Sequence, residues 1–227
     1  MKRTLLFFTA AILMISGASC QSKDNTTNQQ RALKAQQTIT PVEVAPIEGL
    51  DRAYFASGCF WCVEAVYESL SGVKESISGY SGGHTLNPTY ASSNTGRTGH
   101  AEAVEIIYNA QEIRFSDLVD VYFGSQNIEQ VNGQGPDRGS QYRSIIFYQN
   151  QAQKDIIDSK IKELEQTLGK GNVAAEVLPF EKFWKGESYH QNYERLHPNN
   201  PYIQNVSIPR LRKFQKKFPD LLKTRQH

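Results

Sequence analysis

The sequence predicts an α+β domain, built as a two-layer sandwich around a mixed or antiparallel sheet. Hydrophobic residues alternate in some stretches and follow helical spacing in others. These stretches succeed one another in the order β-α-β-β-α-β and then α-β, which is typical of a split βαβ, or ferredoxin-like, core with extensions. The 227 residues, of which 39% are hydrophobic and 21% charged, suit one globular domain with additional segments.

The chain opens with a stretch that is typical of a secretory signal peptide. Two basic residues precede an apolar run from Leu5 to Ile15, and small residues then lead to Cys20. The run is too short for a stable membrane span. A cysteine directly after the small residues predicts a lipoprotein-type signal over residues 1–19 with lipidation of Cys20. Because Gly17 stands where such signals prefer leucine, ordinary cleavage with Cys20 incidental is the alternative.

Residues 20–49 have the composition of a flexible polar tether. They are rich in Gln, Asn and Thr up to Ile39 and then contain Pro41 and Pro46, so they can bury little. We therefore expect a protein exported by a bacterium, anchored by lipid at the periplasmic face of a membrane, and folded from residue 50 to residue 227. Without the two basic residues of the leader, acidic and basic residues are equal in number. Charge therefore gives no reason to expect nucleic acid as a partner.

The first half of the domain is expected to contain three strands and two helices. The expected strands are Ala53–Ser57, Val73–Tyr80 and Glu102–Tyr108. The expected helices are Phe60–Leu70, ended by Ser71 and Gly72, and Phe115–Gly124, with Ser116 near its N-cap. The segment Ser81–Gly99 is rich in Gly, Ser and Asn, and its length marks it as a candidate functional loop.

The second half adds two strands and three helices. The expected strands are Arg143–Tyr148 and Val173–Val177. The expected helices are Gln151–Leu168, ended by Gly169, Tyr189–Leu196, ended by Pro198, and the basic amphipathic Pro209–Leu222. Asn127–Gly139 is a second glycine-rich loop.

The sequence Gly-Cys-Phe-Trp-Cys stands at residues 58–62, between the first strand and the first helix. Free backbone N–H groups and the dipole at a helix start favour an anion, which makes the Cys59 thiol a candidate nucleophile. A C-x-x-C pair can be a redox dithiol, half of a zinc site, or a coincidence. Zinc needs four ligands, and the chain has no further cysteine in the domain and no paired histidine motif. We therefore expect thiol chemistry and no metal.

Two loop motifs accompany this cysteine pair. Gly82–Tyr90 and Thr98–Glu102 bracket the first loop, and Gly135–Arg143 lies in the second. With these motifs in this order, the chain resembles the peptide-methionine (S)-S-oxide reductases, the A-type methionine sulfoxide reductase family, from about Ala53 to Tyr202. The resemblance implies reduction of methionine S-sulfoxide, free or in oxidised proteins, as a repair activity.

The resemblance also implies a role for each site residue. These roles are the nucleophile (Cys59), an aromatic wall for the S-methyl group (Phe60 and Trp61), an acid beside the sulfoxide oxygen (Glu102), hydroxyls that bind that oxygen (Tyr90 and Tyr142), a loop carboxylate that orders the site (Asp137), and a support of the wall (His190). The chemistry fits, because attack on sulfur places negative charge on the oxygen, which must be protonated and held. A buried carboxyl group stays protonated and can supply that proton. Each residue alone also has an ordinary structural interpretation.

The chain departs from the family pattern at Cys62, where many members carry glycine and place recycling cysteines near the C-terminus. No cysteine follows Cys62. We expect Cys62 to resolve a sulfenic acid on Cys59 as a disulfide, which a thioredoxin-like dithiol reduces. The alternative is that Cys62 is only a small buried residue and that an external thiol reacts with the sulfenic acid. A second departure is Gln126–Glu129, where many members have His-Asp-Pro-Thr.

Two other functions are compatible with parts of the motif. A non-catalytic module could recognise methionine through Phe60 and Trp61, but binding alone needs neither Cys59 nor Glu102. A thiol–disulfide oxidoreductase would use the same cysteine pair, but the two bulky residues between the cysteines disfavour it. No flavin, nucleotide or phosphate-loop motif is present, so we expect no cofactor. We expect a monomer.

Overall fold

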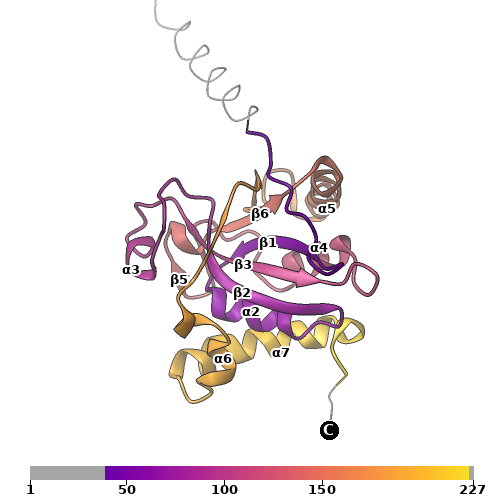
Figure 1. The fold of residues 1–227 in the computed structure, drawn as a ribbon. Helices are drawn as coiled ribbons and strands as arrows, with labels where there is room; N and C mark the ends of the chain where they lie inside the picture. Colours follow the sequence, from indigo (N-terminus) through magenta and orange to yellow (C-terminus); the bar gives the residue numbers. More distant parts are fainter. Residues whose placement is uncertain (1–38, 225–227) are drawn as a thin grey trace, which may run out of the picture. The chain divides into compact units, whose positions relative to one another are not determined.

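A six-stranded mixed sheet in the order β7-β6-β1-β3-β2-β8 lies at the centre of the fold (Figure 1). The computed structural model describes residues 39–224. The strands are β1 (Asp51–Ser57), β2 (Val73–Ser81), β3 (Ala101–Tyr108), β6 (Ser144–Tyr148), β7 (Glu176–Pro179) and β8 (Phe183–Lys185). Neighbouring strands are antiparallel, except for the parallel pair β6 and β7. The four middle strands, β6-β1-β3-β2, have the order of a split βαβ core, so the predicted fold class is confirmed.

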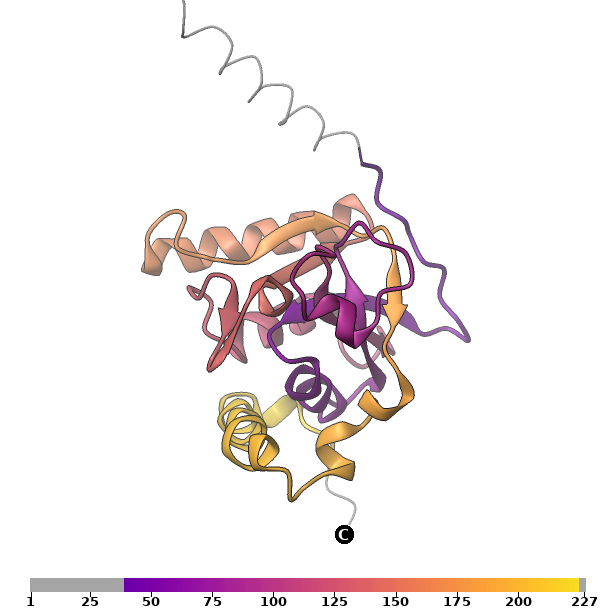
Figure 2. The same ribbon diagram turned by 90° about the vertical axis from the view of Figure 1, so that its left-hand side faces the viewer.

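The helices α2 (Phe60–Glu68) and α4 (Phe115–Gly124) bury their apolar sides in the main core, which also contains the sheet residues Phe55, Val104 and Ile106. On the outer side of α2 lies α7 (Ile208–Lys217), as Figures 1 and 2 both show. The long helix α5 (Gln151–Leu168) packs beside α4 and β6. The start of α2 is thereby enclosed between the sheet and the C-terminal helices.

A smaller core covers the other face of the sheet. The Tyr54 ring stacks on Phe180, from the link between β7 and β8, with ring centroids 3.7 Å apart. Residues before β1 join this layer, because the Val42 N–H donates to the Phe180 carbonyl oxygen at 2.7 Å and the Val44 N–H donates to Gln149 Oε1 at 2.9 Å. The folded part thus begins before residue 50, where the composition predicted its start. The predicted signal peptide and Cys20 lie outside the described residues.

Several predicted elements differ from the structure. The predicted strand Val173–Val177 lies later in the chain, as β7, because only residues from Glu176 onward pair with β6. Ser116 does not cap α4: the N-cap is Arg114, whose N–H donates to the Asp117 carboxylate at 3.0 Å. The short strand β8 was not predicted, because three residues carry too little periodicity to mark a strand.

The C-terminal region contains shorter elements than predicted. Asn192, with φ of +55°, divides the predicted helix Tyr189–Leu196 into η2 (Ser188–His190) and α6 (Tyr193–Leu196). The last helix ends at Lys217, and a separate turn, η4 (Pro219–Leu221), follows it. The two glycine-rich loops also contain structure, namely α3 (Tyr90–Ser93) and the hairpin of β4 (Gly133–Gln134) and β5 (Asp137–Arg138). None of the helices in residues 39–224 is both long and apolar enough to cross a bilayer.

Candidate active site

Cys59 occupies the N-cap position of α2, directly after β1. Its side chain is 6% exposed, and it makes no capping hydrogen bond, so the thiol is available for other interactions. Gly58 makes the turn before it with φ of +87°, and a Cβ there would lie 2.5 Å from Cβ of Gln134. Both the backbone angle and the close packing require glycine at this position. Cys59 is therefore fixed at the helix start by the turn that precedes it.

Glu102 reaches the same helix start from β3 on the sheet. Its side chain is 2% exposed, and its Oε2 accepts the Phe60 backbone N–H at 3.1 Å. Burial raises the pKa of the Glu102 carboxyl group to about 8, and the hydrogen bond from Phe60 only partly opposes this effect. Glu102 is thus a protonated acid at neutral pH, held one residue from Cys59.

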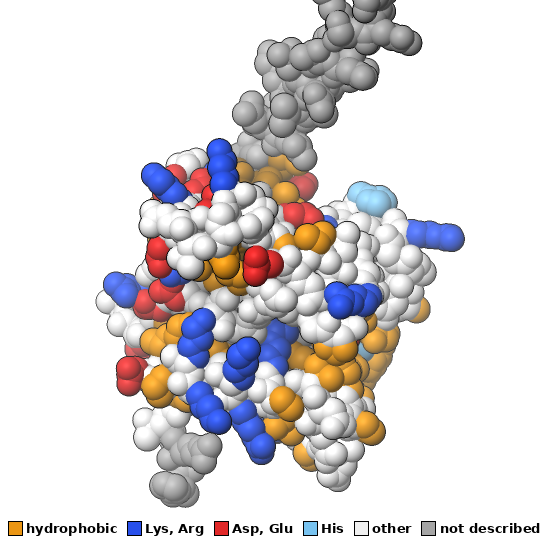
Figure 3. Space-filling view, turned by 180° about the vertical axis from the view of Figure 1, so that it is seen from behind, with side chains coloured by type: hydrophobic (Ala, Val, Ile, Leu, Met, Phe, Trp, Pro, Cys, Tyr) orange, Lys and Arg blue, Asp and Glu red, His pale blue; other side chains and the backbone are white. Residues whose placement is uncertain are grey.

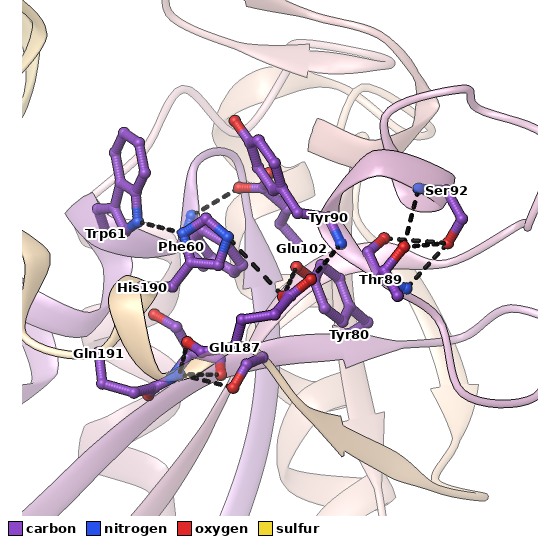
Figure 4. A network of polar contacts seen from close by, with 12 residues as sticks. Phe60, Trp61, Tyr80, Thr89, Tyr90, Ser92, Glu102, Glu187, His190 and Gln191 are labelled. Carbon is purple, nitrogen blue, oxygen red and sulfur yellow. Dashed lines mark hydrogen bonds and ion pairs between the residues drawn. The ribbon is translucent and has the colours of Figure 1, made fainter.

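Aromatic side chains form a wall around this helix start (Figure 4). The Phe60 ring is fully buried and lies near His190, with ring centroids 4.8 Å apart. Trp61 is partly exposed, stacks on Tyr193 at 3.8 Å between centroids, and donates its Nε1–H to Nδ1 of His190 at 3.2 Å. Trp61 therefore presents partly exposed aromatic surface, and the buried Phe60 ring packs beside it, with ring centroids 6.1 Å apart.

His190 and Glu187 fix this wall to the first loop. His190 is 1% exposed, and burial lowers the pKa of its imidazole, which is therefore neutral at pH 7. The Glu187 carboxylate accepts the Tyr80 hydroxyl and the Tyr90 backbone N–H, both at 2.8 Å (Figure 4). Tyr90 is the first residue of α3. Glu187 therefore fixes the position of Tyr90, whose hydroxyl the resemblance assigns to binding the sulfoxide oxygen.

The Tyr90 and Tyr142 side chains are both half-buried. Burial raises the pKa of each phenol, and the nearby Glu102 and Cys59 side chains raise both further. Both phenols are protonated hydrogen-bond donors at neutral pH. Tyr142 ends η1 (Ser140–Tyr142), directly before β6. Two separate loops thus bring these hydroxyl-bearing residues close to Cys59 and Glu102 at the start of α2.

Cys62 lies one helical turn after Cys59 and is 2% exposed. Its Sγ is 3.7 Å from the Tyr202 hydroxyl oxygen, and that hydroxyl donates to Oδ2 of Asp137 at 2.6 Å. Burial raises the pKa of the Cys59 thiol, and the adjacent Cys62 and Glu102 raise it further. Interaction with the Cys59 thiol lowers the pKa of Cys62 to about 7. The pair therefore loses its first proton near neutral pH, and both cysteines are free thiols here.

The segment Gln126–Glu129, which departs from the family pattern, supports the turn before Cys59. Gln134 packs against Gly58, and its side chain accepts the Asn127 N–H at 2.9 Å and donates to Oε1 of Gln126 at 3.1 Å. Gln126 also accepts the Ser144 hydroxyl at 2.7 Å. Gln126 and Asn127, the first two of the four residues that replace His-Asp-Pro-Thr in this chain, thus form a hydrogen-bond network with Gln134 behind the cysteine turn.

The structure brings every site residue predicted in the domain to the start of α2 or to the elements that touch it. Tyr202 and Glu187 also belong to this site, although the motifs did not single them out, and so does Tyr193, which lies in the segment around His190 that the resemblance associates with support of the wall. Tyr202 and Glu187 follow β7 and act through contacts with Cys62 and Tyr90, which lie more than 90 positions earlier, so local spacing cannot indicate them. Within residues 39–224, no cluster of His, Cys, Asp and Glu is arranged to bind a metal ion.

This arrangement has the parts that a thiol needs to remove oxygen from sulfur. It combines a buried thiol pair, a protonated carboxyl group and two phenols beside a partly exposed aromatic wall. A neutral, apolar group with one polar oxygen matches such a pocket, because the carboxyl group and the phenols can donate to that oxygen.

The comparisons with known proteins agree with this chemistry. Residues 51–222 match the family model described as peptide methionine sulfoxide reductase. The chain is 42% identical over 174 residues to a peptide methionine sulfoxide reductase MsrA of Saccharolobus solfataricus, covering 77% of this chain and 98% of that protein. It is 43% identical over 172 residues to the MsrA of Pasteurella multocida, covering 76% and 98%.

Two solved structures are similar in fold. Methionine sulfoxide reductase A of Corynebacterium diphtheriae superposes with a TM-score of 0.59 at 29% identity, covering 70% of this chain and 85% of that one. Reduced Mxr1 of Saccharomyces cerevisiae superposes with a TM-score of 0.61 at 28% identity, covering 69% and 91%. The chain therefore belongs to the peptide methionine sulfoxide reductase family.

Proposed function

We propose that this enzyme reduces the S epimer of methionine sulfoxide, free and in oxidised proteins, with Cys59 as the nucleophile. The observation that carries the proposal is the placement of Glu102, whose carboxyl group is buried, protonated at neutral pH and bonded to the N–H of the residue after Cys59. A binding module would not need an acid of raised pKa beside a thiol pair. The preference for the S epimer is taken from the family resemblance.

In the first step Cys59 attacks the sulfoxide sulfur as a thiolate, which is the form of the coupled pair in which Cys62 holds the remaining proton. Charge moves onto the oxygen, which Glu102 protonates while Tyr90 and Tyr142 donate hydrogen bonds to it. The oxygen then passes to Cys59, so the products are methionine and a Cys59 sulfenic acid. The Trp61 surface holds the S-methyl group by apolar contact, since sulfur–aromatic contacts contribute about 0.3–1.5 kcal/mol.

In the second step Cys62 attacks the sulfenic acid on Cys59. A disulfide forms and water leaves, so the enzyme is oxidised by two electrons and methionine sulfoxide has been reduced by two. A thioredoxin-like dithiol then returns both cysteines to thiols. Cys62 is one helical turn from Cys59, and its contact with Tyr202 keeps its side chain in the site.

The activity is tested by giving the full-length protein separated R and S epimers of a methionine sulfoxide peptide with dithiothreitol as reductant. We expect loss of the S epimer only. Persistence of the S epimer would refute the reductase activity. The role of Cys62 is tested separately with Cys62→Ser, which should complete one turnover and then stall with thioredoxin. Turnover with thioredoxin at the parent rate would show that Cys62 does not resolve the intermediate.

We further infer, from the leader alone, that the enzyme is exported and anchored to a membrane through a lipid on Cys20. The support is the basic start, the apolar run and the small residues before Cys20. The measurement is fractionation of cells that produce the parent protein or Cys20→Ser. The parent should be found with membranes and the variant in the soluble exported fraction. Equal distribution of the two proteins would contradict lipidation.

A further inference from the structure

One arginine joins the two loops that carry Tyr90 and Tyr142. Arg143 directly follows Tyr142, the last residue of η1, and directly precedes β6. Residues 82–100 connect β2 to β3 and form the Tyr90 loop. This loop, which contains α3, and the segment after β5 lie at the same end of the sheet (Figure 1). They touch, because a Cβ added at Gly96 would lie 3.3 Å from the Ser140 hydroxyl oxygen.

The Arg143 guanidinium group donates hydrogen bonds to both ends of the Tyr90 loop and to η1. Nη2 donates to the carbonyl oxygens of Gly99 and Gly82, at 3.0 and 3.5 Å. Nη1 donates to the Ser140 carbonyl oxygen at 3.0 Å. Gly82 is the first residue after β2, and Gly99 lies two residues before β3, so the two acceptors mark the base of the loop. One planar group thus connects both ends of one loop to the turn in the other.

The burial of Arg143 makes these acceptors necessary. Figure 3 shows Lys and Arg side chains that project from the surface of one face of the domain, whereas the Arg143 side chain is only 14% exposed. Its Nε donates to Oε1 of Glu176, at the start of β7, at 3.1 Å. N–H groups that have lost contact with water need protein acceptors in its place. The guanidinium group is therefore held in one orientation by the groups that accept from it.

The base of the Tyr90 loop is also braced from within. The His100 ring bridges it, because Nδ1 accepts the Gly83 N–H at 3.1 Å and Nε2 lies 2.8 Å from the Thr85 carbonyl oxygen. Tyr90 follows Thr85 by five residues and begins α3. The base thus moves as a unit, and a displacement of it is passed on to Tyr90.

We propose that Arg143 is a positioning residue for the sulfoxide reduction. Its guanidinium group holds the base of the Tyr90 loop against η1, so that the phenols of Tyr90 and Tyr142 meet at one sulfoxide oxygen. The inference rests on the proposed function, because that reaction needs both phenols at the same oxygen. Arg143 acts through these two residues, since its own hydrogen bonds go to three backbone carbonyl oxygens and one carboxylate. Tyr142 precedes it in the chain, so a displaced Arg143 backbone moves that phenol as well.

Lysine cannot replace this group, although it carries the same charge. Its ammonium is a single nitrogen and cannot donate to acceptors that Arg143 reaches with three separate nitrogens. Arg143→Lys should therefore loosen the contact between the two loops without changing the net charge. Because a misplacement of about 1 Å can lower a rate about 100-fold, we expect a loss of about tenfold or more in the chemical step.

The test is a mutant cycle on single-turnover formation of methionine from a peptide of methionine S-sulfoxide. The full-length parent, Arg143→Lys, the double variant Y90F/Y142F and the triple variant are compared. Arg143→Lys should lower the rate about tenfold or more in the parent, and by less than about twofold in Y90F/Y142F, where the phenols that it aligns are gone. An equal loss in both backgrounds would overturn the proposal, and so would an unchanged rate in the parent. A parent that leaves the peptide oxidised would instead refute the proposed function.

Two further variants show which contact of Arg143 matters. Arg114→Lys makes the same change in the exposed Arg114–Asp117 ion pair and is the matched control, so its rate should stay within about twofold of the parent. Glu176→Gln removes the charge opposite Arg143 but keeps an acceptor for its Nε, and its rate should also stay within about twofold. A loss with Glu176→Gln as large as that with Arg143→Lys would assign the effect to the ion pair with β7 and overturn the proposal.

Thiol reactivity separates a positioning role from a general disturbance of the site. Alkylation of the cysteine pair by iodoacetamide needs a thiolate but no phenol, so Arg143→Lys should react at the rate of the parent. A loss of alkylation equal to the loss of reduction would overturn the proposal. If Arg143→Lys is unfolded at the assay temperature, Arg143→Ala with added guanidinium ion takes its place, because that ion offers the same planar set of N–H donors. The ion should restore most of the lost rate in this variant only, and no restoration would overturn the proposal.

Discussion

The pH dependence of the first step offers a direct test of Glu102 as the proton donor. With a pKa of about 8, about 90% of Glu102 is protonated at pH 7 and about 10% at pH 9. At its ordinary value of 4.5, only about 0.3% would be protonated at pH 7, so burial raises the acid population about 300-fold. Because the protonated form donates, the rate should fall about tenfold for each pH unit well above 8.

The assay is single-turnover formation of methionine from a sulfoxide peptide between pH 6 and pH 10. Thiol ionisation should give a rise near pH 7, where the cysteine pair loses its first proton, and Glu102 should give the fall above pH 8. Glu102→Gln keeps a hydrogen-bond donor but has no acidic proton, so we expect a rate about 100-fold lower and no fall above pH 8. A variant that keeps the alkaline fall would show that another group titrates there, and the assignment of Glu102 would be wrong.

Three further predictions concern the support of the site. Gly58→Ala should lower the free energy of unfolding by 2 kcal/mol or more, because φ is +87° and the new Cβ would lie 2.5 Å from another side-chain carbon. Gly135→Ala, with φ of +57° and open space, should cost only about 1 kcal/mol, and equal losses in urea titrations would contradict the packing argument. Glu64→Ala leaves the Ser78 hydroxyl and the Asn192 N–H without their acceptor. KM for the sulfoxide peptide should therefore rise by a larger factor than kcat falls. Glu64→Gln should restore KM. Burial raises the pKa of Glu64 to about 7 in the folded protein. The contribution of Glu64 to the free energy of unfolding should therefore be lost as pH rises through 7. If the stability of the Glu64→Gln protein had the same pH slope, this assignment would be refuted.

The long, strongly periodic elements were predicted well, whereas short elements, caps and several contacts between distant residues were not. The helix Gln151–Leu168 has the bounds that its polar–apolar pattern and Gly169 indicated, because a long helix repeats its pattern many times. Strand β7 was misplaced because Val173 and Ala175 are apolar like Val177, although pairing with β6 begins only at Glu176. Tyr202 was missed as a site residue because its role depends on its distance to Cys62 in the folded chain, which no spacing rule provides.

The alignment of the substrate wall depends on the same helix that carries the cysteines. Glu64 lies on α2 one turn after Phe60, and its buried carboxyl group accepts the N–H of Asn192, the left-handed residue that precedes α6. Tyr193 follows directly and stacks on Trp61. One helix thus fixes the thiol at its start, the aromatic wall in its first turn and, through Glu64 in its second turn, the segment of Asn192 and Tyr193. A shift of α2 by one residue would displace all three together, and Gly58, with φ of +87° and Gln134 packed against it, makes the turn that sets the start of the helix.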